Sequence, residues 1–419
     1  MSADAQHTLV IGGGVIGIAC AHYLHQAGHR VTVIDRGRIG GACSHGNCGF
    51  VCPSHVLPMA EPGAIKSAIP AMLKPGGALR IRPRLDRNLW RWLWNFRSRC
   101  NRDDMLASGR AIQPLLLSSL DLYEELIESE SLDCEWQKRG LLYVYRDPVL
   151  LESYRATNEL TAAEFNESAR HLDGQQLVEF EPGVKNDLAG AWFFEHDAHL
   201  RPDRLIASWR SRLEADGVRF IEGCTLTSLE VTDGRVRAAG TSGETISADT
   251  FVIATGAWTP QLEHLLGLRI PIEPGKGYSL IVPRPPHSPR VPIIFPEHRV
   301  AITPFEAGMR IGSTMEFAGY DESIRPARLK QLTDGASHYM RDPIPNSFTD
   351  PWYGWRPMTY DSTPVIGRCP GRSNVFLATG HNMLGLSMAP ATGRLVSELI
   401  MGSEPHLETG CYAAERFLR

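Results

Sequence analysis

The fold is decided by the stretch Leu9-Val10-Ile11-Gly12-Gly13-Gly14-Val15-Ile16-Gly17. Its leading apolar residues predict a short buried strand, and its glycines form a GxGxxG turn. A helix rich in Ala, Ile and Leu follows over 16–26, and residues 30–35 carry the β-branched side chains of a second strand. Strand, turn, helix and strand in this order predict the first half of a doubly wound parallel sheet.

A turn of this kind suits the pyrophosphate of a dinucleotide. Gly12 permits the tight turn, and Gly14 lets the backbone approach a phosphate. Gly17 lets the helix pack closely on the strand. The helix that begins near Val15 and Ile16 offers phosphates its free N–H groups and the positive end of its dipole.

Asp35 and Arg36 follow at the end of the second strand. A carboxylate at this point is placed to accept hydrogen bonds from a ribose diol. This context favours dinucleotide binding over a glycine turn that merely packs the helix. We therefore predict cofactor contacts at Gly12, Gly14, Val15, Ile16, Gly17, Asp35 and Arg36.

The composition bounds the class of protein. A chain of 419 residues suggests two or three domains, and a net charge of -4 argues against nucleic acid as the main partner. The nine cysteines follow no regular spacing, which favours free thiols in a reducing compartment. The apolar run 8–21 has no preceding Lys or Arg and is too short to span a bilayer, so we expect a cytoplasmic protein.

The rest of the chain alternates between helical and strand patterns. Apolar residues at helical spacing predict helices over 87–99, 107–128, 150–165 and 204–216 and within 322–340. Short strands are predicted over 140–145, 218–253, 277–282 and 309–313, with turns at Asp233-Gly234 and Ser242-Gly243. From Pro351 onward the sequence predicts turns, then a strand over 375–378 and a final helix over 389–401.

Two later segments favour FAD over a nicotinamide. The strand that ends in Ala254-Thr255-Gly256 is similar to the strand beneath the adenine half of FAD in many flavoproteins. The small-residue stretch 380–390 leads into the final helix, whose N-terminus would stabilise negative charge on a reduced flavin ring. We predict further FAD contacts at Ala254, Gly256, Gly380, Met383, Gly385, Leu386 and Ser387.

These motifs together resemble the D-amino acid dehydrogenase branch of the FAD-dependent D-amino acid oxidase superfamily. The resemblance runs in the family's order through the segments 12–17, 44–49, 274–279, 312–317, 354–364 and 380–390. Lys276-Gly277-Tyr278-Ser279 and Trp355-Arg356-Pro357-Met358-Thr359 are the segments more typical of the dehydrogenase branch.

The resemblance implies an α/β architecture. A Rossmann-like FAD-binding domain would be built from the discontinuous segments 1–80, 200–260 and 350–419. A mixed-sheet α+β substrate-binding domain, residues 81–199 and 261–349, would cover the flavin. Hydride would pass from Cα of an amino acid to flavin N5, and the electrons would go to a quinone or another carrier.

Arg356 matches the family's carboxylate-binding arginine, and a planar two-pronged cation suits a substrate carboxylate. The alternative is a surface arginine before a proline turn. Tyr278 resembles a tyrosine that reaches the same carboxylate, unless it only packs in a sheet. His381 would lie near the pyrimidine end of the flavin, or have a structural role. Ser44, Asn47 and Gly49 lie in the loop that wraps the flavin in the family.

Two clusters leave alternatives open. Cys43, Cys48 and Cys52, with His45 and His55 nearby, fit no strong metal signature, so we expect no metal. We expect small side chains around the flavin instead, with Cys48 or Cys52 lining the active site. Residues 80–102 carry eight Arg and three Trp. They predict either a substrate-domain helix with a solvated basic face or an amphipathic helix that contacts an anionic membrane surface.

The activity expected is oxidative deamination of a D-amino acid. Cyclic substrates such as D-proline or a hydroxy-D-proline are candidates, because no acidic residue can be assigned to read a basic side chain. The alternatives are a glycine- or sarcosine-type amine oxidase that produces hydrogen peroxide and a flavin-containing subunit without turnover.

Overall fold

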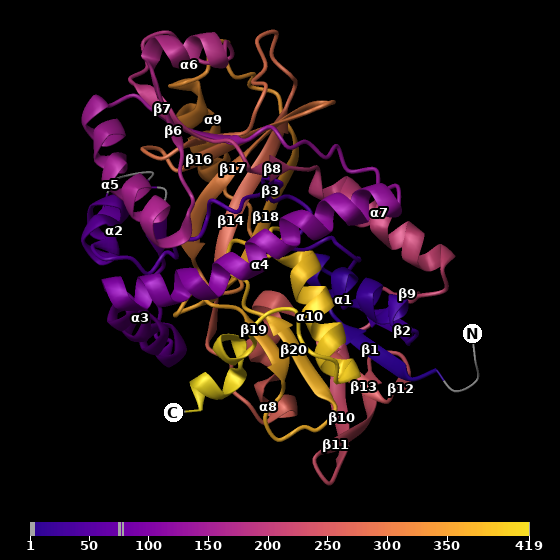
Figure 1. The fold of residues 1–419 in the computed structure, drawn as a ribbon. Coiled ribbons are helices and arrows are strands. Elements are labelled where there is room, and N and C mark those ends of the chain that lie inside the picture. The colour runs from indigo at the N-terminus through magenta and orange to yellow at the C-terminus, as the bar shows by residue number, and fades with distance from the viewer. Residues whose placement is uncertain (1–4, 74–76, 78, 419) are drawn as a thin grey trace.

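The computed structural model describes residues 5–73, 77 and 79–418, and it contains two large sheets (Figure 1). The first has six strands in the order β19-β20-β13-β1-β2-β9 and lies in the lower half of Figure 1. Its strands are β1 (His7–Ile11), β2 (Arg30–Ile34), β9 (Arg219–Ile221), β13 (Thr250–Ile253), β19 (Val365–Arg368) and β20 (Val375–Thr379).

This sheet confirms the doubly wound prediction. All its pairings are parallel except that of β19 with β20. Every residue of β1, β13 and β20 is buried. Continuous apolar strands are typical of a parallel sheet that is covered on both faces.

Helices cover one face of the six-stranded sheet, and a small three-stranded sheet covers the other face. On one face α1 (Val15–Gln26), α4 (Arg102–Ser129), α7 (Pro202–Ala215) and α10 (Ala389–Met401) share one apolar core with β1 and β2. On the other face the small sheet of β10 (Leu226–Thr232), β11 (Arg235–Thr241) and β12 (Thr245–Ser247) packs against Leu9, Ile11 and Phe251.

The second sheet has nine strands and is mixed, as expected for the substrate-binding part. Its order is β18-β14-β17-β16-β15-β5-β7-β6, with β4 beside β17. The strands are β4 (Leu79–Ile81), β5 (Leu141–Tyr145), β6 (Arg170–Asp173), β7 (Gly190–Phe194), β14 (Ile272–Val282), β15 (Ile293–Phe295), β16 (Val300–Phe305), β17 (Gly308–Phe317) and β18 (Thr349–Thr359). Helices α6 (Gly174–Phe180) and α9 (Pro326–Ser337) pack beside it at the upper end of Figure 1.

The prediction of turns after Pro351 was wrong, because Thr349–Thr359 forms the edge strand β18. Pro351 and Pro357 suggest turns in the sequence, but an edge strand tolerates proline because one of its sides needs no hydrogen-bond partners. β18 pairs with β14 in the second sheet, although the predicted boundary at residue 350 assigned it to the FAD-binding domain. The domain limits as a whole stay a prediction.

Two further helices lie where the sequence predicts them. Helix α3 spans Arg87–Arg99 and α5 spans Pro148–Phe165. The short elements are β3 (Phe50–Val51) paired with β8 (Ala198–His199), α2 (Ala64–Leu73), α8 (Glu263–Leu266) and the 3-10 turns Gly256–Leu262, Gly410–Tyr412 and Ala414–Phe417.

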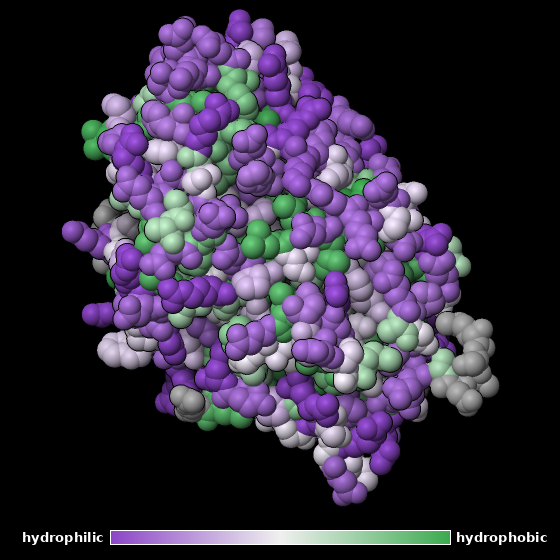
Figure 2. All heavy atoms as spheres, in the orientation of Figure 1, coloured by the Kyte–Doolittle hydropathy of each residue, from purple (hydrophilic) through white to green (hydrophobic). Residues whose placement is uncertain are grey.

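The surface carries its apolar residues unevenly. The face in Figure 2 is mostly hydrophilic, with apolar side chains in small groups. On α3, Trp92 is buried, whereas Trp90 and Trp94 are 56% and 70% exposed. No helix in the described part of the chain has the length and apolar character that crossing a bilayer requires.

Candidate functional site

One cavity of about 1670 Å³ is lined by residues of both large sheets. This volume exceeds the roughly 300–1,000 Å³ of a typical small-ligand pocket, so it can hold a dinucleotide together with a substrate. The residues predicted for the site that line it are Gly12, Gly14, Val15, Ile16, Asp35, Arg36, Ser44, Asn47, Gly49, Ala254, Gly256, Tyr278, Arg356, His381, Met383, Gly385, Leu386 and Ser387. Gly17 and Gly380 are not part of this wall.

The GxGxxG turn forms one end of the cavity. Gly12 has φ +111, and a Cβ there would overlap the carbonyl of Ala254, so only glycine fits. No side chain caps α1 at Gly14 in the described chain, and the hydroxyl of Ser44 accepts a 3.1 Å hydrogen bond from the Val15 amide. This helix N-terminus suits a phosphate anion.

Asp35 is held in place at the end of β2. Its carboxylate accepts hydrogen bonds from the amides of Gly13 at 2.8 Å and Gly37 at 2.7 Å. The guanidinium of Arg36 lies 4.2 Å from the ring centre of Trp258. Asp35, Arg36 and Trp258 all line the cavity. The Asp35 carboxylate is the acceptor that the hydroxyls of a ribose need. The Arg36 guanidinium over the Trp258 ring is the flat surface that an adenine needs.

Arg356 lies on β18 and extends across the neighbouring strand. Its guanidinium covers Gly277 so closely that a Cβ at 277 would overlap it. It donates a 3.0 Å hydrogen bond to the carbonyl of Thr314. Burial lowers its pKa, partly offset by Cys43 and Cys48. No acidic side chain of the described residues forms an ion pair with it, so this cation lacks a counter-charge inside the chain.

Tyr278 lies on the opposite face of the sheet from Arg356. β14 pairs Gly275 with Arg356 and Tyr278 with Tyr353, and successive residues of a strand point to alternate faces. The hydroxyl of Tyr278 donates to Glu316 at 2.8 Å. This geometry gives no support to a carboxylate contact from Tyr278.

His381 lies in the loop before α10 and is 2% exposed. Its Nε2 is 3.0 Å from the hydroxyl of Thr392. Burial lowers the pKa of His381 to about 3, so the imidazole is neutral at physiological pH. It lines the cavity and is at the same time anchored to α10.

The sequence did not predict the hydrogen bond between Tyr143 and His55 in the cavity wall. The hydroxyl of Tyr143 is 2.7 Å from Nε2 of His55, and both residues line the cavity. Burial lowers the pKa of His55 to about 4 and raises that of Tyr143. The sequence offered one signal, since His55 lies close to the cysteine cluster and six residues after the predicted flavin loop 44–49.

The wall beside Arg356 is largely apolar. Met315, whose sulfur lies 3.7 Å from the Arg356 guanidinium, belongs to one apolar cluster with Leu79, Ile81, Trp92, Phe96 and Phe317, and all six line the cavity. Glu61 also lines the cavity, although the sequence offered no acidic residue there. Burial raises the pKa of Glu61, and the charge of Arg299 opposes this shift.

Two of the clustered cysteines reach the cavity. Cys43 and Cys48 line it, whereas Cys52 is buried behind the wall. Burial raises the pKa of the Cys43 thiol to about 11, against the opposing effect of Arg356. Within the described residues, no group of three or more His, Cys, Asp or Glu side chains is arranged to hold a metal.

The fold and this cavity define a dinucleotide-binding protein with a second sheet over the cofactor pocket. The particular family follows from comparison: the chain belongs to the FAD dependent oxidoreductase (DAO) family, whose model matches residues 7–399. This confirms FAD as the cofactor and an oxidoreductase as the class of enzyme. The glycine turn, the fixed carboxylate of Asp35 and the cavity volume fit that cofactor.

Relatives agree with this assignment. The chain is 33% identical over 415 residues to a D-amino acid dehydrogenase of Paramagnetospirillum magneticum, and the match covers 98% of both chains. A D-amino acid dehydrogenase of Xanthobacter autotrophicus is also 33% identical, again over 98% of both. These matches confirm the resemblance stated from the motifs.

Solved structures share the fold. Glycine oxidase from Geobacillus kaustophilus has a TM-score of 0.78 at 22% identity and covers 98% of this chain and 99% of its own. L-proline dehydrogenase from P. horikoshii has a TM-score of 0.74 at 19% identity and covers 99% and 98%. At these identities the likeness concerns the fold alone.

Proposed function

We propose that this protein is an FAD-dependent dehydrogenase of D-amino acids. Arg356 is the observation that carries the proposal, because it is a cavity-lining cation without an acidic partner among the described residues. Such a cation favours an anionic ligand, and a carboxylate matches its two-pronged donor geometry. The relatives named D-amino acid dehydrogenase support the substrate class.

The cofactor contacts follow from the wall of the cavity. The turn 12–17 would hold the pyrophosphate, and Asp35 would hold the ribose. The loops 42–49 and 380–388 would enclose the ring. Ala254 and Gly256, at the end of β13, would lie beneath the adenine half.

The residues of this chain would orient the substrate for oxidation. Bound FAD supplies the acceptor for the hydride that leaves Cα. Arg356 would fix the carboxylate and thereby restrict the rotation of Cα relative to the ring. The imine product then hydrolyses to a keto acid, or stays cyclic when the substrate is proline-like.

The substrate side chain would contact the apolar wall. Trp92, Phe96 and Phe317 favour an apolar or cyclic side chain such as that of D-proline. Glu61 and Arg299 also line the cavity, and their opposite charges offset each other, so we expect neither acidic nor basic side chains to be preferred.

The electron acceptor would be a quinone in an anionic membrane. Leu85, Trp90 and Trp94 are exposed on or next to α3, and Arg87 and Arg91 are exposed on the same helix. Aromatic side chains and arginines are the groups that bind the interface of an anionic bilayer. Trp92 and Phe96 of the same helix line the cavity, which would bring the flavin close to that surface.

An anaerobic screen tests the activity. Purified holoenzyme is mixed with D- and L-amino acids, glycine and sarcosine, and the flavin absorbance is followed. We expect bleaching by D-amino acids with apolar side chains, followed by fast reoxidation with a soluble quinone and slow reoxidation with oxygen. Bleaching by glycine or sarcosine with stoichiometric peroxide would contradict the proposal, and so would no bleaching by any D-amino acid.

A further inference from the structure

Loop 42–49 lies against the second sheet, and the sheet holds it by its backbone carbonyls. Trp352 of β18 donates to the carbonyl of Ala42 at 3.3 Å, and Ser279 of β14 donates to that of Gly46 at 2.7 Å. Thr303 of β16 donates to the carbonyl of Cys48 at 2.6 Å.

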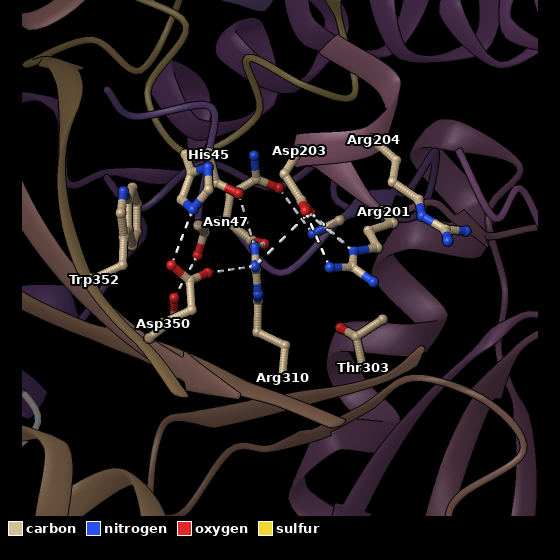
Figure 3. Close-up of polar contacts among 12 residues, drawn as sticks. His45, Asn47, Arg201, Asp203, Arg204, Thr303, Arg310, Asp350 and Trp352 are labelled. Atoms are coloured by element: carbon tan, nitrogen blue, oxygen red, sulfur yellow. Dashed lines mark hydrogen bonds and ion pairs between the residues drawn. The ribbon is translucent and has the colours of Figure 1, made fainter. Parts of the chain in front are cut away.

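Arg310 of β17 is the centre of this contact (Figure 3). One nitrogen of its guanidinium donates to the carbonyls of His45 at 2.8 Å and Asn47 at 3.0 Å. The other forms a 3.0 Å ion pair with Asp350, which also accepts a 3.0 Å hydrogen bond from His45. The Arg310 side chain is fully buried, and hydrogen bonds from a charged donor are stronger than neutral ones, so Arg310 defines the position of the loop strongly.

The direction of the carbonyls fixes the direction of the amides. In a trans peptide the carbonyl of one residue and the N–H of the next point in opposite directions, and the described chain contains no cis peptide. The amides of Cys43, Gly46, Asn47 and Cys48 therefore point away from the sheet. No acceptor among the described residues takes their hydrogen bonds, and all four residues line the cavity.

We propose that Ser279, Thr303, Arg310 and Trp352 are positioning residues that fix loop 42–49 so that its free amides face the flavin ring. This rests on the proposed assignment of that loop to the flavin. Backbone N–H groups directed at the ring stabilise the negative charge that it gains on reduction. Trp352 and Arg356 lie four residues apart on β18, so the strand that carries the proposed carboxylate anchor also holds the loop.

Conservative variants of the holoenzyme test this. Ser279→Ala/Thr303→Val removes two hydroxyl donors at little cost in volume. We expect FAD to dissociate about tenfold more readily on serial dilution and ultrafiltration. We also expect the equilibrium between oxidised and reduced flavin to shift about tenfold toward the oxidised form, a fall of about 30 mV in midpoint potential. Arg310→Lys keeps the charge but loses the forked donors, and should shift both quantities further.

The matched control is Thr161→Val/Ser397→Ala. These buried hydroxyls also donate to backbone carbonyls, of Asn158 and Tyr23, but neither carbonyl belongs to loop 42–49. We expect the control to keep the parent's midpoint potential. A Ser279→Ala/Thr303→Val potential equal to that of the control would overturn the proposal, even if FAD affinity falls. This outcome is independent of the substrate screen, because it needs no amino acid.

Discussion

Arg356 lines the cavity as a cation that has no acidic partner among the described residues. Its guanidinium lies over Gly277 and beside the carbonyl of Thr314, so its direction is defined before any ligand arrives. A lysine at this position would keep the charge but lose the fork.

We expect Arg356→Lys to lower kcat/KM for the preferred substrate by about 30- to 1,000-fold, or roughly 2–4 kcal/mol, with little change in Tm. Steady-state kinetics and thermal unfolding measure the two effects. Arg328→Lys, a buried arginine bonded to Gly77 and Gln331, is the matched control. A loss below about threefold in kcat/KM would show that Arg356 does not anchor the substrate.

Asp35 gives a second test at the scale of one side chain. Its carboxylate is fixed by the amides of Gly13 and Gly37 and would accept ribose hydroxyls. We expect Asp35→Asn to weaken FAD binding about tenfold, which is ~1.4 kcal/mol, because an amide has one acceptor oxygen where the carboxylate has two. FAD retained after dilution is the measurement. Glu244→Gln, at an exposed carboxylate paired with Arg219, is the control, and equal FAD loss in both would contradict the assignment.

At the scale of elements, the sequence predicted what local patterning determines. The strand and helix around Gly12 have an unbroken apolar run and a distinctive turn, and α3 has clear helical spacing. β18 was missed because its prolines resemble turns, and its status as a strand depends on pairing with β14, which is distant in sequence. The same distinction between local sequence patterns and long-range contacts applies to the residues of the candidate site. The motif predicted Arg356 as a site residue, and Arg356 lines the cavity. The side to which Tyr278 points and the pairing of His55 with Tyr143 depend on tertiary packing.

Helix α3 supplies a test at this scale. Trp90 and Trp94 are exposed, and Trp92 is buried with its indole N–H bonded to the carbonyl of Met358. We expect the protein to sediment with anionic liposomes, less so at high salt because charges are screened over about 8 Å at physiological ionic strength. Trp90→Ala/Trp94→Ala should reduce binding at every salt concentration. Val149→Ala/Leu150→Ala removes exposed apolar side chains from α5 and should not. If both double variants bind liposomes equally, α3 does not contact the membrane and is a surface helix that packs beside the second sheet.

At the scale of the whole molecule, the cofactor would bridge the two sheets. A ligand that binds only the folded state stabilises it by about 2.7 kcal/mol at a free concentration of 100 times Kd. We expect Tm to rise with added FAD and to rise much less with FMN, which has no second phosphate or adenosine for the turn and Asp35. Thermal unfolding at graded concentrations of each flavin is the measurement. Equal shifts of Tm with FAD and FMN would mean that the adenylate half of FAD contributes nothing to binding.

Stability should also depend on pH through Asp197. This carboxyl is 1% exposed and accepts hydrogen bonds from the amide and hydroxyl of Ser54. Burial raises the pKa of Asp197 to about 7, against the opposing effect of those bonds. The folded state therefore binds the proton more tightly than the unfolded state does, so this group contributes stability below about pH 4 that is lost as pH rises to 7.

We expect the Tm of the parent minus that of Asp197→Asn to fall between pH 4 and 7 and to be level above. The amide cannot ionise, so the difference isolates the carboxyl. The contribution lost is at most about 4 kcal/mol. A difference that does not change with pH would show that Asp197 is already ionised at pH 4.

The strand order of the first sheet has a consequence for the order of synthesis. β1 and β2 leave the ribosome early, yet β1 pairs with β13, and β13 pairs with β20 near the end of the chain. The loop that precedes α10 is translated later still. In a nascent chain, the glycine turn is therefore synthesised long before the later strands and the loop that complete the cavity. We therefore expect FAD to bind only after β20 and the loop before α10 have been translated, and until then the amides that would hold its phosphates are exposed to water.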